Sequence, residues 1–159
     1  MKRKIALIAG ATILCASILS GCASTSPVDK YLRSMDKGDS EAASQIYSEE
    51  IKENDEDKEA LQAKLKERMD SIYEDFKAGK ITADEAKEKL KDYKEYDTSS
   101  VYAFTTINKV TTLQKSKDAY SNAEKAENDG NLADAITNYK EVIEDDSNYE
   151  TAQAKVLQL

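Results

Sequence analysis

Apolar residues recur every three or four positions through most of this 159-residue chain, which is the spacing of one face of an α-helix. The clearest stripe lies in residues 61–76 and consists of Leu61, Leu65, Met69, Ile72, Tyr73 and Phe76. Charged residues fill many of the positions between them, as on the solvated side of a helix. The pattern therefore predicts a helix with one buried face and one exposed face.

Glycine and helix-capping residues divide the rest of the chain into further helices. Gly38, Gly79 and Gly130 each follow an apolar stripe, and glycine is the usual residue just past a helix C-terminus. Thr82 and Glu85 have the spacing of a capping box, in which each side chain bonds the other residue's backbone at a helix start. These signals predict an all-α fold of six or seven helices, stacked as antiparallel hairpins. Its expected parts are a hairpin at 28–53, a middle hairpin at 55–95, a long helix and hairpin at 98–149, and a last helix at 150–159.

Residues 98–129 have the least regular pattern. The segment 101–106 is rich in residues that favour strands, and two Thr pairs weaken a helix locally. However, no turn residue interrupts the segment, and apolar residues repeat every three positions at Val101, Phe104, Ile107, Val110 and Leu113. We therefore predict one long helix over 98–129, with a kink near Ser116 as the alternative to a straight helix. The two helices that follow are expected to present Leu132, Ala135, Ile136, Tyr139 and Val142, and then Ala152, Val156 and Leu157.

The N-terminal segment has a different pattern. Three basic residues precede an almost unbroken apolar run over 5–19, which is shorter than the ~20 residues that a membrane-spanning helix needs. The run ends in Leu19, Ser20, Gly21 and Cys22, and this sequence resembles the lipobox of bacterial lipoproteins. The resemblance implies diacylglyceryl transfer to the Cys22 thiol and cleavage before it. The alternatives are an ordinary secretory signal, or a transmembrane anchor, that contains this cysteine by coincidence.

The lipobox resemblance sets the expected organisation and location of the chain. Residues 1–21 would be a cleaved signal peptide, 22–27 a short linker and 28–159 a helical domain. Cys15 lies in the apolar run, so Cys22 would be the only cysteine of the mature chain. A diacylated cysteine carries two acyl chains, which is enough for stable anchoring. We therefore expect a lipid-anchored protein at the extracytoplasmic face of the cell membrane.

Composition narrows the classes of function. Without residues 1–21 the chain has 20 basic and 31 acidic residues, a net charge of −11, because the leader holds three of the 23 basic residues. Such a domain is repelled by nucleic-acid phosphates, so we expect no nucleic-acid partner. Histidine is absent and the one mature thiol would be acylated, so nucleophile–histidine pairs and histidine metal sites are excluded. We expect no enzymatic activity, cofactor, metal or small-molecule substrate; an enzyme that uses carboxylates alone is the remaining alternative.

An internal repeat suggests how the hairpins are built. Gly38 is followed by Ala43 and Tyr47, and Gly130 by Ala135 and Tyr139 at the same spacing. Together with Ala123, these residues resemble the tetratricopeptide repeat, closely at 116–149 and weakly at 28–53. In that family glycine forms the turn, alanine lets the helices approach and the aromatic residue fills the groove beyond. The resemblance implies a helical surface that binds a protein or peptide.

Nine tyrosines complete the set of candidate residues. Five tyrosines have the spacing of hairpin cores: Tyr47, Tyr73, Tyr93, Tyr120 and Tyr139. Three others lie off the main stripes and are candidates for partner contact: Tyr96, Tyr102 and Tyr149. The favoured hypothesis is a membrane-anchored adaptor or scaffold with a protein or peptide partner. The alternative is a structural spacer or self-assembly module of the cell envelope without a dedicated ligand.

Overall fold

A computed structural model describes residues 25–159, and within them it contains seven α-helices, one π-helical turn and no strand. The helices are α1 (Pro27–Asp36), α2 (Ser40–Ile46), α3 (Asp55–Lys77), α4 (Ala83–Lys94), α5 (Ser100–Asn128), α6 (Leu132–Lys140) and α7 (Tyr149–Gln158), and the π-turn η1 (Tyr47–Ile51) continues α2. The predicted all-α fold with six or seven helices is confirmed. The lipobox and Cys22 lie outside the described residues.

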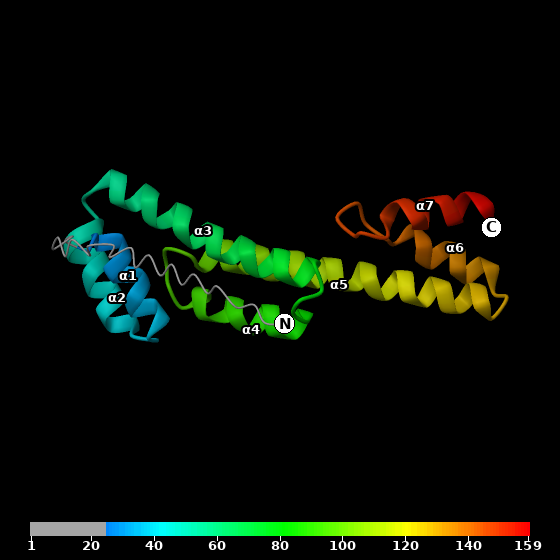
Figure 1. The fold of residues 1–159 in the computed structure, drawn as a ribbon, viewed down its shortest axis with the longest axis horizontal. Coiled ribbons are helices and arrows are strands. Elements are labelled where there is room, and N and C mark those ends of the chain that lie inside the picture. The colour runs from blue at the N-terminus through cyan, green and yellow to red at the C-terminus, as the bar shows by residue number, and fades with distance from the viewer. Residues whose placement is uncertain (1–24) are drawn as a thin grey trace, which may run out of the picture.

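Helix α5 is the axis of an elongated molecule (Figure 1). Its first half packs with α3 and α4 as three helices of alternating direction, and the α1–α2 hairpin covers one end. Its second half packs with α6, which in turn contacts α7. We call residues 27–113 the N-terminal lobe and residues 116–158 the C-terminal lobe, because each contains its own cluster of buried apolar side chains.

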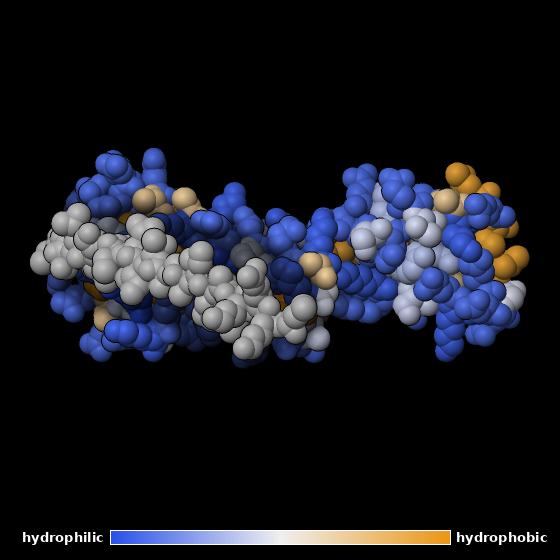
Figure 2. All heavy atoms as spheres, viewed as in Figure 1, coloured by the Kyte–Doolittle hydropathy of each residue, from blue (hydrophilic) through white to orange (hydrophobic). Residues whose placement is uncertain are grey.

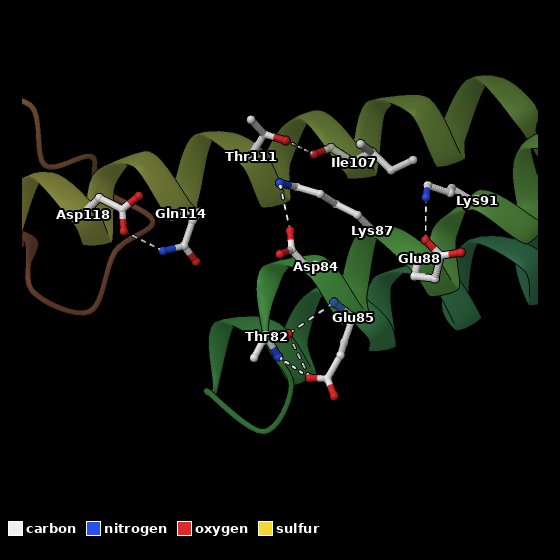
Figure 3. A network of polar contacts seen from close by, with 10 residues as sticks. All are labelled: Thr82, Asp84, Glu85, Lys87, Glu88, Lys91, Ile107, Thr111, Gln114 and Asp118. Carbon is white, nitrogen blue, oxygen red and sulfur yellow. Dashed lines mark hydrogen bonds and ion pairs between the residues drawn. The ribbon is translucent and has the colours of Figure 1, made fainter.

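The predicted helix ends are present. Gly38 and Gly130 have φ of +71° and +77°, a left-handed conformation that glycine adopts without steric cost, and each ends a helix. At the start of α4 the Glu85 amide donates to Thr82 Oγ1 at 3.2 Å, and the Thr82 amide donates to Glu85 Oε2 at 2.7 Å (Figure 3). This reciprocal pair is the capping box that the sequence predicts. It fixes where α4 begins after the turn from α3.

Thr82→Ala should lower the free energy of unfolding by about 1 kcal/mol, because the Glu85 amide loses its side-chain acceptor at the helix start. Urea denaturation followed by circular dichroism measures the change. Thr112→Ala is the matched control, since Thr112 is exposed within α5 and caps no helix. An equal loss of stability in the two variants would contradict a capping role for Thr82.

The long helix that the sequence predicts is present as α5, but its apolar series does not lie on one buried face. Val101 and Phe104 are 78% and 56% exposed, whereas Ala103, Thr106 and Val110 are buried. The reason is geometric: a step of three residues turns about 300°, so a series of such steps drifts around the helix. Val101 and Val110, nine residues apart, therefore point in nearly opposite directions.

Two leucines of the C-terminal lobe also differ from the prediction. Leu132 and Leu157 are 45% and 88% exposed, although the sequence pattern placed both on inner faces. The fully buried side chains of Ala135 and Tyr139 form the inner face of α6 instead, and Ala152 forms that of α7. Apolar surface gathers at this end of the molecule, where Leu159 is also exposed (Figure 2).

Polar contacts fix the connection between α6 and α7 to α3 of the N-terminal lobe and to α5 within its own lobe. The Asp145 carboxylate accepts hydrogen bonds from Tyr73 and Lys77 of α3. The buried Asp146 accepts one from Ser116 Oγ of α5 at 2.8 Å. Burial acts to raise the pKa of Asp145, but the bonds from Lys77 and Tyr73 outweigh it and hold that pKa below its usual value. The charged carboxylate therefore holds the C-terminal lobe against α3.

Candidate protein-binding groove

A cavity of about 300 Å³ opens between α3 and the start of α5. We call it the α3–α5 groove, and its lining residues are Gln62, Leu65, Lys66, Met69, Asp97, Thr98, Val101, Tyr102 and Thr105. Its floor comes from the α3 stripe, where Leu65 and Met69 are each 1% exposed. The groove is thus an opening onto the core of the N-terminal lobe, and it is large enough to receive an apolar side chain.

Tyr102 forms one wall of the groove and is held in place by its hydroxyl group. The hydroxyl donates to Asp70 Oδ1 at 2.5 Å, and Lys66 Nζ lies 5.6 Å from the ring centroid. Burial, with the hydrogen bond to Asp70, raises the pKa of Tyr102 to about 12. The phenol is protonated at physiological pH, as it would be at its ordinary pKa of about 10, and its hydrogen bond to Asp70 fixes the aromatic surface.

The outer face of α5 beside the groove is unusually apolar for this chain. Residues 98–108 contain no charged residue, although 34% of all residues are charged. Within this segment Val101 and Phe104 are largely exposed. Exposed apolar surface next to a cavity is typical of a binding site, because water solvates it poorly. The uncharged run is the sequence signal that could have indicated this surface.

The three tyrosines expected to contact a partner have different environments. Tyr102 lines the groove, as described. Tyr96 is only 8% exposed and its ring lies 6.1 Å from that of Tyr31, so it belongs to the core and is not a surface residue. Tyr149 is half-buried against the apolar cluster of the C-terminal lobe. The structure therefore brings only one of the three to the groove.

The residues of the internal repeat lie where the hairpins close. Ala43, Ala123, Ala135 and Tyr139 are each 0% exposed, while Tyr47 is half-buried. Tyr139 packs edge-to-face on Tyr120, with ring centroids 5.6 Å apart, and its hydroxyl donates to Glu127 at 2.8 Å. Small residues thus let α5 and α6 approach closely. The tetratricopeptide resemblance itself remains a prediction.

The described residues contain neither a metal-binding cluster nor a helix that could cross a membrane. No group of three or more His, Cys, Asp or Glu side chains in residues 25–159 is arranged to hold a metal ion. No helix in the same range is long and apolar enough to cross a membrane. Comparison with protein-family models, with curated proteins and with solved structures gives no match for this chain.

Proposed function

We propose that this protein is a lipid-anchored, extracytoplasmic adaptor that binds a segment of a protein partner in the α3–α5 groove. The membrane anchor is supported by the lipobox-like sequence Leu19 to Cys22 after a short apolar run. The binding role is supported by one observation above all, the exposure of Val101 and Phe104 beside a cavity with an apolar floor.

The partner segment should carry an apolar side chain that enters the groove. Full burial of a Val or Phe side chain contributes about 1.5–3 kcal/mol, so covering Val101 and Phe104 supplies a driving force for association. The phenol of Tyr102 and the amide of Gln62 add directional contacts at the groove wall. Aromatic anchors in such positions commonly dominate the binding energy of an interface.

A photo-crosslinking amino acid at position 104 of the tagged full-length protein should capture the partner in native membranes. Adding Val101→Glu to this variant should reduce the adduct at least about tenfold, because a charge would enter the apolar contact. Gel analysis with mass spectrometry measures the adduct. The same crosslinker at exposed position 137 of α6 is the matched control and should not form it. A partner captured equally from both positions, or unaffected by Val101→Glu, would overturn the groove as the binding site.

A self-assembly role is the second candidate, and it rests on a different surface. Leu132, Leu157 and Leu159 expose apolar side chains at the end of the C-terminal lobe (Figure 2). An apolar patch on a soluble domain is also a common site of self-association. The crosslinking experiment separates the two roles. Adducts that contain only further copies of this chain, formed from position 137 and not from position 104, would favour assembly over the adaptor role.

A further inference from the structure

A second cavity, of about 240 Å³, lies between α1, the end of α2 and the α4–α5 connection. We call it the tyrosine pocket, and its lining residues are Tyr31, Ser44, Tyr47, Glu95, Tyr96, Asp97 and Thr98. Three aromatic side chains from distant parts of the sequence meet here. None of the seven lining residues is basic. The pocket therefore combines aromatic walls with negative charge.

The three rings are held at angles to one another. The Tyr31 ring lies 6.3 Å from that of Tyr47 and 6.1 Å from that of Tyr96, with interplanar angles of 64° and 63°. Tyr31 and Tyr96 are 2% and 8% exposed, whereas Tyr47 is half-buried at the opening. A hydrogen bond of 2.9 Å between the Tyr31 hydroxyl and Thr98 Oγ1 fixes the central ring. The rings thus form rigid walls around the cavity.

The backbone at Tyr47 is itself unusual. Helix α2 changes at this residue into the π-turn η1, in which the Lys52 amide donates to the Tyr47 carbonyl at 2.8 Å. π-Turns are rare, and they occur mostly as single turns that are frequently found at functional sites. This local feature coincides with the wall at the pocket opening.

Two acids line the pocket, Glu95 and Asp97, and both lie on the α4–α5 connection. Burial raises the pKa of both Tyr31 and Tyr96. The negative charge of Asp97 raises the pKa of Tyr31 further. At Tyr96 the charges of three acids do the same: Glu95, Asp92 and Asp39. The basic residue Lys58 lies near Tyr47 but is paired with Asp55 at 2.6 Å. The electrostatic environment of the cavity therefore favours a cationic ligand.

We propose that the tyrosine pocket binds an alkylammonium group. A cation is attracted to the faces of aromatic rings, and several rings around a small cavity are the usual way in which proteins hold substituted ammonium groups. Glu95 and Asp97 at the rim add a charge-paired contact. The rings supply apolar surface for the alkyl part of the ligand, which a cluster of acids alone would not provide.

The tyrosine pocket adjoins the α3–α5 groove. Asp97 and Thr98 line both cavities, so the two open on either side of the α4–α5 connection. A partner segment with a lysine next to an apolar residue would place one side chain in each cavity. This link to a lysine rests on the proposed function, whereas ammonium binding by the pocket does not. A small quaternary ammonium molecule is the other source of the same chemistry.

Titration of the full-length protein in detergent micelles with two cationic probes tests the proposal. The probes are Nα-acetyl-lysine methylamide and choline, and 3,3-dimethylbutan-1-ol is the neutral counterpart of choline. We expect a cation to bind with a Kd of about 1 mM, detected by NMR signals of ¹³C-labelled tyrosine. Preference for the lysine probe assigns the pocket to a partner's side chain, and preference for choline assigns it to a small molecule.

Variants of Tyr47 separate pocket binding from nonspecific effects. Tyr47→Leu should weaken the cation at least about fivefold, while Tyr47→Phe keeps the ring and should bind as the unaltered protein does. Tyr149→Leu removes a half-exposed tyrosine of the other lobe and is the matched control, expected to cause no change. Circular dichroism checks that each variant is folded.

Absence of binding for both cations, equal binding of the neutral alcohol, or no effect of Tyr47→Leu would overturn the proposal. None of these outcomes depends on capture of a partner at position 104, so the pocket and the adaptor role can fail separately.

Discussion

Cys22→Ala should abolish lipid attachment to the full-length protein. The lipobox resemblance implies that the Cys22 thiol accepts the diacylglyceryl group and that cleavage follows lipidation. The variant should therefore incorporate no labelled fatty acid and should keep residues 1–21. Metabolic labelling measures the first effect, and intact-mass spectrometry measures the second. The change is all-or-none, because alanine has no nucleophilic side chain.

Cys15→Ala is the matched control for this prediction. Cys15 is the only other cysteine of the chain and lies within the apolar run, where it is expected to leave with the leader. This variant should incorporate the label and mature to the same mass as the unaltered protein. Labelling that persists in Cys22→Ala, or that is lost in Cys15→Ala, would reject Cys22 as the lipidation site. An ordinary secretory signal would give no label in any of the three proteins.

Tyr139→Ala should unfold the C-terminal lobe while the N-terminal lobe remains folded. Tyr139 is the largest fully buried side chain of the smaller cluster, where it packs with Ala123, Ala135, Val142 and Ala152. Removing a buried aromatic side chain costs about 3–5 kcal/mol, because a cavity replaces its contacts. Such a loss is large for a lobe with so few buried residues. Hydrogen exchange measured along the chain should show loss of protection in α6 and α7 and retained protection in α3 and α4.

Tyr139→Phe provides the control for that prediction. It keeps the ring but removes the hydrogen bond from the hydroxyl to Glu127, which also pairs with Lys155 at 2.6 Å. The expected cost is about 1 kcal/mol, so the lobe should remain folded. Loss of protection in both lobes of Tyr139→Ala would show that they unfold as one unit. The polar contacts of Asp145 with α3 would then couple the lobes more strongly than their separate cores suggest.

Local signals account for the part of the fold that the sequence predicted well. Gly38 and Gly130 end helices because their backbone needs a left-handed conformation, and Thr82 begins one because its side chain accepts from a free amide. The apolar stripe of α3 also predicted its helix correctly, since one face of that helix is buried along most of its length. Each of these features depends on residues within a few positions of one another.

The features that the sequence did not predict depend on which helices and connections pack against one another. The outward position of Val101 and Phe104 could not be predicted, because apolar character alone does not say which side of α5 its neighbours occupy. The tyrosine pocket joins residues 31, 47 and 96 through the packing of α1, η1 and the α4–α5 connection, and no local pattern brings them together. Tyr96 was expected at the surface because it lies outside the helical stripes. It is buried since the loop that carries it folds back onto α1.

The buried faces of the two halves of α5 point in opposite directions, so this helix sets the angle between the two lobes. Its first half buries Val110 and its second half Ala119, and these positions differ by about 180° around the axis. One residue inserted between Leu113 and Ser116 would therefore rotate the C-terminal lobe by about 100° and carry Asp145 away from Tyr73. Seven inserted residues would nearly restore the original angle between the lobes and would lengthen α5 by about 10 Å. The reach of this molecule can thus change without altering the angular relation of its lobes through insertions of about seven or eleven residues, which are two or three helical turns.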